Sequence, residues 1–326
     1  MARVFYDANA SLEPLLGMTV CVYGYEDVGR AQALNLRDSG VHVLVCERLE
    51  TPEARRAHSE GFELVEGVEG VLRGDVLALR VADLEQEDLF RSAIAPRLTP
   101  GKMLLFYHGF AIPFGRVRPP EGVDVALIAP QGRGELLRQM FVEGQGVPCL
   151  VGVRQDATGR AWARALAYGK AIGVTRAGLI KTSFEEEPET DRFGEQAVLC
   201  GGITELVHAS YETLVGAGYA PEVAYFEVLH ELKRVVDLME AHRNSGRCHL
   251  TRSPRVLDTR VRERLQQMLR EIQEGRFARE WMAENPAGEP RHGRLLEEGR
   301  GHPIEEVGRR LRAMRPWFPT QEGTSG

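Results

Sequence analysis

The sequence predicts an N-terminal α/β domain with a Rossmann-type parallel sheet, followed by an all-α domain. A chain of 326 residues is long for one hydrophobic core, so two domains are expected. In the first half, short β-branched runs alternate with helical patterns, as in a parallel sheet covered by helices on both faces. From about Phe184 onward almost no strand pattern is left. We expect domains over 1–183 and 184–318, and a disordered tail over 319–326.

In the first domain, the predicted strands and helices alternate along the chain. The expected strands cover residues 18–24, 41–47, 75–81, 103–109, 123–130 and 147–153, and the expected helices cover 29–40, 83–98, 135–144 and 157–173. Ligands of such folds bind beyond the carboxyl ends of the strands. The residues that follow each strand are therefore the first candidates for a site.

The second domain is expected to consist of helices alone. Long apolar-periodic helices are predicted over 197–218 and 221–242, the second with Pro221 in its first turn. Shorter amphipathic helices are predicted over 261–275 and 304–314.

Composition and charge narrow the functional class. A net charge of −6 gives no reason to expect nucleic acid or an anionic membrane as partner. No apolar run approaches the roughly 20 residues that cross a bilayer, and the N-terminus has no secretory apolar core. The five cysteines are scattered without a C-x-x-C spacing, which is typical of free thiols in a reducing compartment. We expect a cytoplasmic protein.

The stretch from Val20 to Gly40 indicates a strand that enters a helix through a nucleotide-binding turn. Such a turn requires G-x-G-x-x-G, but the spacing here gives Gly24, Glu26 and Gly29. A carboxylate thus stands where the backbone approaches a pyrophosphate. Either this is not a nucleotide site, or it is one that has been changed.

Two carboxylate pairs in the helical half share one spacing. Asp191 with Glu195, and Glu227 with Glu231, are each four residues apart and so lie on one helix face. The apolar neighbours of Glu227 indicate a helix buried on several sides, where a lone carboxylate is costly. Ordinary solvated helix faces are the alternative. The repeated spacing favours a site for two Mg²⁺ ions, which prefer oxygen ligands.

Several long motifs together resemble the ketol-acid reductoisomerase family in its short, class I form. They are RAQALNLRDSG, YHGFAI, IAPQGRG, DRFGEQAVLCGG, AYFEVLHELKRVVDL and GRFAREWMAENPAG, and they extend over nearly the whole chain. The resemblance implies a Rossmann-type domain and a helical, knotted, dimer-forming domain. In the family, two Mg²⁺ ions and NADPH convert an acetohydroxy acid to a dihydroxy acid, by alkyl migration followed by hydride transfer.

The resemblance also implies site residues. The metal ligands would be Asp191, Glu195, Glu227 and Glu231, with the two pairs from different subunits, so a homodimer or higher homo-oligomer is implied. The catalytic residues would be His108 of the HGF motif, Gln131 at the position of a family lysine, and Glu231 as a metal-bound carboxylate that takes a proton. The cofactor-binding residues would be Gly24, Tyr25, Glu26, Asp27, Gly29, Arg48, Thr51, Asp83 and Gly134.

The departures from the family pattern lie in the sites. Glu26 and Asp27 add negative charge beside a pyrophosphate, and Glu53 would repel a 2′-phosphate. Gln131 lacks the charge of the family lysine. The segment from Leu238 to Pro254 is shorter and lacks the family's substrate-contacting serines, and of the family's L-P-D-E loop only Asp83 is retained.

These departures favour a diverged Mg²⁺-dependent enzyme that acts on a small oxo- or hydroxy-acid, by isomerisation or alkyl migration without hydride transfer. The first alternative is a working ketol-acid reductoisomerase with unusual contacts to NADPH or NADH. The second alternative is a non-catalytic relative. The retained metal carboxylates are evidence against it, because an unused cluster of like charges costs stability.

Overall fold

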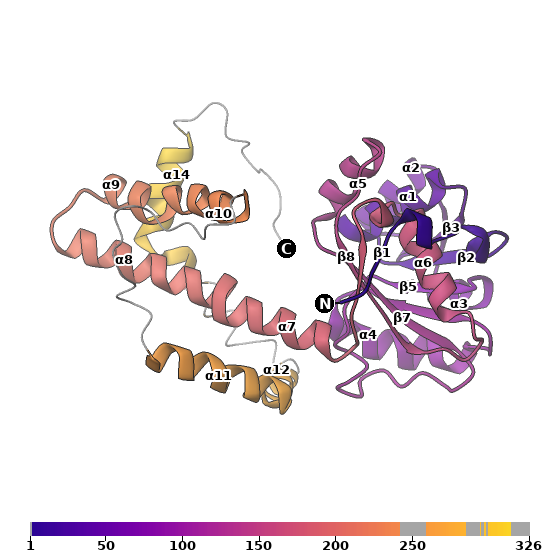
Figure 1. Cartoon of the computed structure of the whole chain (residues 1–326). Coiled ribbons are helices and arrows are strands. Elements are labelled where there is room, and N and C mark those ends of the chain that lie inside the picture. The colour runs from indigo at the N-terminus through magenta and orange to yellow at the C-terminus, as the bar shows by residue number, and fades with distance from the viewer. Residues whose placement is uncertain (1, 242–258, 285–293, 295–296, 298, 314–326) are drawn as a thin grey trace. The chain divides into compact units, whose positions relative to one another are not determined.

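The computed structural model describes residues 2–241, 259–284, 294, 297 and 299–313, and it divides the chain into two compact units (Figure 1). The first unit is Met1–Thr190 and the second is Asp191–Gly326. The expected tail over 319–326, and most of the shortened segment before Pro254, lie outside the described residues.

A nine-stranded sheet forms the centre of the first unit in the part of the chain that the structure describes. The strands are β1 (Val4–Phe5), β2 (Thr19–Tyr23), β3 (His42–Cys46), β4 (Glu63–Val65), β5 (Val76–Leu79), β6 (Met103–Phe106), β7 (Asp124–Pro130), β8 (Cys149–Gln155) and β9 (Leu179–Lys181). Their spatial order is β1-β9-β8-β7-β6-β5-β2-β3-β4. Neighbours are parallel except β1 with β9 and β7 with β8, so the sheet is mostly parallel.

Helices cover both faces of this sheet. They are α1 (Asp27–Asp38), α2 (Pro52–Ser59), α3 (Gly67–Arg73), α4 (Asp83–Leu89) with the segments Phe90–Ile94 and Ala95–Arg97 that continue it, α5 (Gly134–Val142) and α6 (Ala161–Ala171). Alternate residues of one strand enter different cores: Val20 and Val22 of β2 face α1 and α6, whereas Cys21 and Tyr23 face α3. This burial on both faces explains why the strands read as continuous apolar runs.

The sheet differs from the expected one in three strands and one direction. The six expected strands are present, but β1, β4 and β9 were not expected, because runs of two or three residues give no periodic signal. Strand β8 runs antiparallel to β7, with a register shift between Val125 and Ala126. A pattern of alternating strands and helices does not encode the direction in which each strand joins its neighbour.

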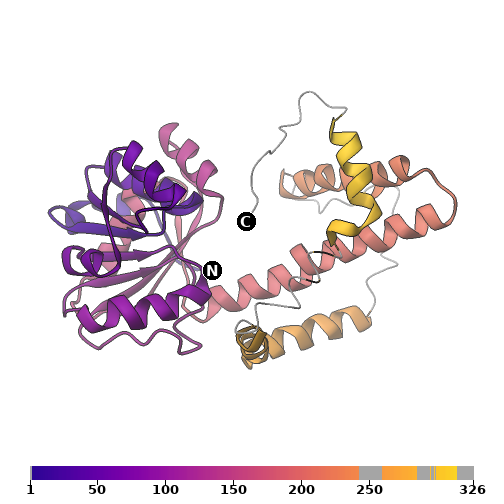
Figure 2. The same cartoon turned by 180° about the vertical axis from the view of Figure 1, so that it is seen from behind.

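The second unit is helical in its described part. Helix α7 (Glu186–Gly194) crosses the boundary and continues without a break through η6 (Glu195–Ile203) into α8 (Thr204–Gly216) (Figure 1). The other helices are α9 (Pro221–Tyr225), η7 (Phe226–His230), α10 (Glu231–Ala241), α11 (Thr259–Gln273), α12 (Arg276–Glu284) and α14 (Pro303–Ala313). Helix α14, yellow in Figure 2, packs on α9 and α8 around a core that includes Tyr211, Tyr225 and Ile304.

Two segments of this unit are π-helical rather than α-helical. They are η6 and η7, which interrupt the two long helices that the sequence predicts. The wider π turn appears mostly as short interruptions of α-helices, frequently at functional sites. Both interruptions contain or adjoin the carboxylates predicted to bind metal.

No helix in the described ranges has both the length and the apolar character to cross a membrane.

Candidate dinucleotide and metal sites

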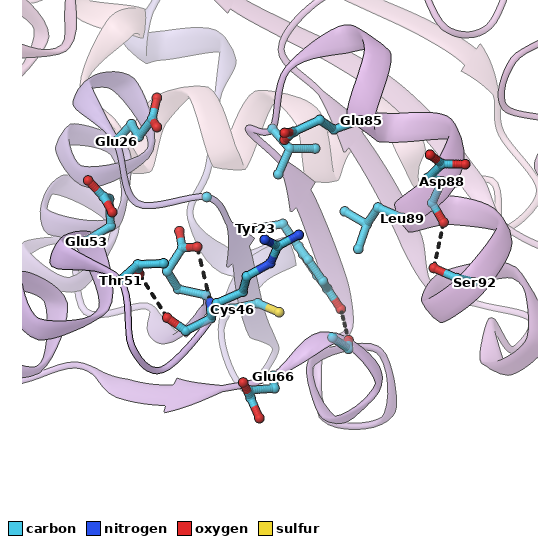
Figure 3. A pocket seen from close by; sticks show the side chains of 15 residues that line it. Tyr23, Glu26, Cys46, Thr51, Glu53, Glu66, Glu85, Asp88, Leu89 and Ser92 are labelled. Atoms are coloured by element: carbon cyan, nitrogen blue, oxygen red, sulfur yellow. Dashed lines mark hydrogen bonds between the residues drawn. The ribbon is translucent and has the colours of Figure 1, made fainter. Parts of the chain in front are cut away.

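A cavity of about 660 Å³ opens at the carboxyl edge of the sheet (Figure 3). Strand β2 lies between β3 and β5, so the chain moves outward through β3 and β4 and then returns to the other side of β2. Such a reversal of strand order leaves a crevice in which dinucleotides bind. The predicted cofactor residues Gly24, Glu26, Arg48 and Thr51 line this cavity.

Of the three glycine positions of the dinucleotide-binding turn, two are occupied by glycines that the backbone geometry requires. Gly24 has φ +94°, which favours glycine, and a Cβ on Gly29 would lie 2.1 Å from the carbonyl oxygen of Gly24. Glu26 is extended, with φ −78°, and its exposed side chain lines the cavity. The backbone of the turn is therefore compatible with a dinucleotide-binding turn. The glutamate at position 26 instead of glycine changes only the space and charge that a bound ligand would meet.

Tyr25 does not contribute its side chain to the cavity lining. Its ring is buried against Phe62, and its hydroxyl donates to Glu60 at 2.6 Å. Burial raises the pKa of Tyr25, and the Glu60 carboxylate raises it further. The predicted role of Tyr25 in cofactor binding is thus reduced to its backbone.

Asp27 serves the neighbouring helix. Its carboxylate accepts hydrogen bonds from the backbone N–H groups of Gly134 at 2.9 Å and Glu135 at 3.2 Å, at the start of α5. A Cβ on Gly134 would lie 2.1 Å from the carbonyl oxygen of Asp27, so only glycine permits this approach. Asp83 is the first residue of α4. Neither Asp27 nor Gly134 is among the described residues that line the cavity.

Acidic residues dominate the cavity walls. Thr51 and Glu53 come from the segment after β3, and Glu85 and Asp88 come from α4 on the opposite wall (Figure 3). The lining carboxylates are those of Glu26, Glu47, Glu53, Glu66, Glu85 and Asp88. Among the described lining residues Arg48 alone is basic.

Glu47 is a lining residue that sequence reasoning missed. Its Oε2 accepts from the N–H of Tyr25 at 3.0 Å, and its Oε1 accepts from the N–H of Arg48 at 3.2 Å. The signal was available, because an acidic residue about 20 positions after the glycine turn is part of the dinucleotide fingerprint.

His108 follows β6, two strands from β2, and faces a buried carboxylate. Its Nδ1 lies 3.4 Å from Oε1 of Glu187, and Oε2 of Glu187 accepts from the N–H of Gly109 at 2.7 Å. The Glu187 side chain is only 5% exposed, whereas that of His108 is 25% exposed. Sequence reasoning missed Glu187 because a run of three glutamates, 185–187, is typical of a solvated face.

Gln131 is an exposed residue just after β7. Its side-chain amide donates to the carbonyl oxygen of Ala129 at 3.1 Å, and its backbone N–H donates to Pro148 at 2.8 Å. It is therefore placed at the same edge of the sheet as the glycine turn and His108, but it carries no charge.

The four predicted metal ligands all lie beside the π-helical segments. Asp191 is in α7, Glu195 opens η6, Glu227 is in η7 and Glu231 opens α10. Asp191 and Glu195 are half-buried, whereas Glu227 and Glu231 are exposed, so the expected burial of Glu227 is wrong for the single chain. Its helix is uncovered on that side.

Two of these carboxylates have side-chain partners in the same unit. The Cys200 thiol donates to Glu195 at 2.7 Å, which raises the pKa of Cys200, and Arg234 lies 3.4 Å from Glu231. Within the described ranges, no three His, Cys, Asp or Glu side chains of one chain gather as a metal site. One chain therefore does not bring the two pairs together.

Known proteins match this chain over almost its full length. Residues 14–178 match the family model "Acetohydroxy acid isomeroreductase, NADPH-binding domain", and residues 184–317 match "Ketol-acid reductoisomerase, C-terminal domain". A ketol-acid reductoisomerase (NADP(+)) of Saccharopolyspora erythraea is 47% identical, with 97% of this chain and 98% of that protein covered.

Solved structures agree with the sequence matches. A structure described as an NADH-preferring ketol-acid reductoisomerase from an uncultured archaeon has a TM-score of 0.89 at 36% identity, over 96% of this chain and 99% of that one. A crystal structure of an oxidoreductase of unassigned function from Jannaschia sp. CCS1 has a TM-score of 0.59 at 18% identity, over 79% and 97%. The second likeness shows the fold alone.

These findings correct one expectation. The sequence departures favoured a diverged enzyme that isomerises without hydride transfer, but an identity of 47% over nearly the full length supports the alternative of a working reductoisomerase. The matched NADPH-binding domain includes the altered glycine turn itself. The chain therefore belongs to the ketol-acid reductoisomerase family.

Proposed function

We propose that this chain is a working ketol-acid reductoisomerase, which converts an acetohydroxy acid to a dihydroxy acid with a nicotinamide dinucleotide as hydride donor. The observation that carries the proposal is the match of both family domains, in order, to a chain whose first unit has a cavity at the topological switch point. The NADPH-binding domain supports the use of NADP(H). The dinucleotide supplies the hydride, and this chain's turn and strand ends bind and orient it.

The cavity fits a dinucleotide in shape better than in charge. Its volume and its place beside Gly24 suit the adenosine half of the cofactor. The exposed glutamates reduce the affinity for phosphate groups, while Arg48 attracts them. We therefore expect this turn to bind the pyrophosphate with lower affinity than a turn with glycine at position 26 would.

The metal proposal rests on donor chemistry. Asp191, Glu195, Glu227 and Glu231 would hold two Mg²⁺ ions, since all four supply the hard oxygen ligands that Mg²⁺ prefers. When bound, such ions polarise a ketone oxygen and stabilise a neighbouring alkoxide. Asp191 and Glu195 remain solvent-accessible enough to bind an ion, and Glu227 and Glu231 project from an uncovered helix.

A second copy of the chain would complete the metal site. The helices that carry the carboxylates expose large apolar side chains, among them Val198, Leu199, Val235, Val236 and Met239. Exposed apolar side chains of this kind are typical of a surface that another subunit covers. We therefore include a homodimer, with one carboxylate pair from each copy, in the proposed function.

His108 and Glu187 are proposed to act together at the sheet edge. His108 would donate or accept a proton at a substrate oxygen, and the Glu187 carboxylate, 3.4 Å from its Nδ1, would orient the ring. Glu231 remains the candidate carboxylate that takes a proton, and Gln131 offers an uncharged amide where the family has a lysine. The substrate is a small oxo- or hydroxy-acid.

The test is turnover of 2-acetolactate by purified full-length protein, followed by the loss of nicotinamide absorbance. We expect oxidation of NADPH or NADH that depends on both Mg²⁺ and substrate, and formation of the dihydroxy acid. A variant with Asp191→Asn is the matched control and should lose Mg²⁺-dependent turnover. Absence of dihydroxy acid with both cofactors, over a range of Mg²⁺ concentrations, would contradict the proposal.

A further inference from the structure

The end of β3 carries two residues with opposite preferences for the adenosine ribose. In Rossmann sites an acidic residue at this position accepts a hydrogen bond from the ribose 2′-hydroxyl of NAD, and a nearby arginine accommodates the 2′-phosphate of NADP. Here Glu47 and Arg48 follow β3 directly, and both line the cavity. The contacts around them decide which preference prevails.

Glu47 is held in place by the backbone. Its two carboxylate oxygens accept from the N–H groups of Tyr25 and Arg48, at 3.0 and 3.2 Å, so the carboxylate bridges the glycine turn and the end of β3. Each oxygen can accept a further hydrogen bond. The half-buried carboxylate is therefore already oriented and keeps acceptor capacity for a ribose hydroxyl.

The hydroxyl of Thr51, one of the predicted cofactor-binding residues, already has two hydrogen-bond partners in the chain. Thr51 Oγ1 accepts from the N–H of Ala54 at 3.1 Å, as the N-cap of α2, and donates its proton to the carbonyl oxygen of Arg48 at 2.8 Å. A hydroxyl has one proton to donate. Thr51 therefore has none to offer a phosphate without giving up its contact with Arg48.

The local charge also opposes a 2′-phosphate. Glu47 and Glu53 both line the cavity at this end, and Arg48 is the one cation among the described lining residues. A phosphate monoester brings nearly two more negative charges at neutral pH. Like charges at short range disfavour binding, and a half-buried carboxylate is screened less than an exposed one.

We infer that Glu47 sets the cofactor choice of this enzyme, by accepting a hydrogen bond from a free ribose 2′-hydroxyl and repelling a 2′-phosphate. The site then accepts both dinucleotides but binds NADH more tightly than NADPH. This inference rests on the proposed function, because it requires a nicotinamide dinucleotide in the cavity. It assigns the preference to one carboxylate rather than to the acidic cavity as a whole.

The test is calorimetric binding of NADH and of NADPH to the full-length protein in the presence of Mg²⁺. We expect NADH to bind about tenfold more tightly, a difference of about 1.4 kcal/mol. The variant Glu47→Gln keeps an acceptor oxygen but loses the charge, and should reduce the ratio of the two affinities about tenfold, mainly by tighter NADPH binding. A thermal melt followed by circular dichroism checks that the variant is folded.

Glu85→Gln is the matched control. It removes the same charge from the opposite wall of the same cavity (Figure 3). A change in the general field of the cavity would affect both variants alike, whereas a contact with the ribose belongs to Glu47 alone. We therefore expect the NADH to NADPH ratio of Glu85→Gln to stay that of the unmodified chain.

The outcomes separate the two proposals. Tighter binding of NADPH than of NADH by the unmodified chain, which needs no variant, overturns the inference and leaves the proposed function standing. An equal change of ratio in both variants overturns the specific role of Glu47. If neither dinucleotide binds, the proposed function fails, and the inference fails with it.

Discussion

In the glycine turn, two positions require glycine for the backbone conformation, and a third requires it only for the approach of a ligand. Gly24 and Gly29 are required by a positive φ and by a 2.1 Å approach, whereas position 26 is extended and tolerates any residue. A glycine at position 26 is needed only for the close approach of a pyrophosphate. The residue that replaces it, Glu26, therefore affects cofactor affinity rather than folding.

Glu26→Gly should lower the KM for the nicotinamide cofactor. Removal of an exposed carboxylate beside a pyrophosphate relieves a screened repulsion of about 1 kcal/mol, or roughly fivefold in affinity. The kcat should stay unchanged, because the reacting atoms are elsewhere. Steady-state kinetics checks this, and Glu26→Gln separates charge from size. An unchanged KM in both variants would contradict the assignment of Glu26 to the pyrophosphate.

Glu187→Gln should lower kcat about tenfold or more with little effect on the KM for cofactor. The amide still accepts from Gly109, but it no longer offers a negative charge to His108, whose orientation matters for proton transfer. Glu186→Gln, an exposed neighbour on the same helix, is the control and should behave like the unmodified enzyme.

The sequence predicted which residues line the cavity where a strand end fixes their position, and failed where a contact with a residue distant in the sequence sets the direction of a side chain. Gly24, Arg48 and Thr51 reach the cavity because they follow strands. The direction of the Tyr25 side chain depends on Glu60, which is 35 positions away, and no local pattern contains that contact. Glu187 was missed because its run of three glutamates is typical of a solvated face, whereas its partners His108 and Gly109 are distant in the sequence.

At the scale of elements, long periodic strands and helices were predictable from the sequence, whereas short strands and π-helical segments were not. The six strands and the long helices follow from apolar periodicity, but β1, β4 and β9 are too short for such a signal. Helix α2 was not predicted, although its start has Thr51 as N-cap and proline at the first position. The π-helical segments have no sequence pattern that distinguishes them from α-helix.

Asp27→Ala should destabilise the first unit by about 1 kcal/mol, because the start of α5 loses the acceptor for two backbone N–H groups. A loss of this size corresponds to a melting temperature lower by about 2–4 °C. Differential scanning calorimetry measures it. Asp27→Asn retains one acceptor oxygen and should lose less; equal stability of all three proteins would contradict the capping role.

The contact between α1 and the end of α2 should make stability depend on pH. The hydrogen bond from Arg30 holds the pKa of Glu60 below its ordinary value of 4.5, and the Tyr25 hydroxyl lowers it further. A carboxylate with a lowered pKa stabilises the fold above about pH 4.5, and this contribution is lost as the pH falls through the folded pKa. Glu60→Gln should therefore be less stable than the unmodified chain at pH 7.

Urea unfolding at pH 7 and at pH 3 measures this linkage. The difference between Glu60→Gln and the unmodified chain should be smaller at pH 3 than at pH 7, because protonation of Glu60 removes its charged contact with Arg30 as the pH falls. Glu121→Gln, an exposed residue, should show no difference at either pH. A gap of the same size at both pH values would mean that packing, not charge, holds the contact.

At the scale of the whole molecule, activity should be recoverable by mixing two inactive variants. If each site takes Asp191 and Glu195 from one copy and Glu227 and Glu231 from the other, a dimer of Asp191→Asn with Glu227→Gln has one intact site. Refolding the two together should restore about a quarter of the unmodified activity, because half of the dimers are mixed and each has one good site.

Each variant refolded alone is the control and should stay inactive. A mixture that remains as inactive as its components would mean that all four carboxylates of a site come from one chain, contrary to the proposed dimer. The proposed dimer could be inferred from the sequence only through family resemblance, since nothing in a single chain's pattern states which of its faces another copy would cover.

The π-helical segments have a consequence for how relatives of this chain are aligned. A π turn holds one residue more than an α turn, so every position beyond η7 is rotated by about 100° from where an unbroken α-helix would carry it. A homologue with an ordinary helix here would need a single gap inside Phe226–His230, and an ungapped comparison would pair its outward residues with inward ones. An insertion of one residue in this stretch would therefore turn one α turn into a π turn, and the helix would continue along the same axis.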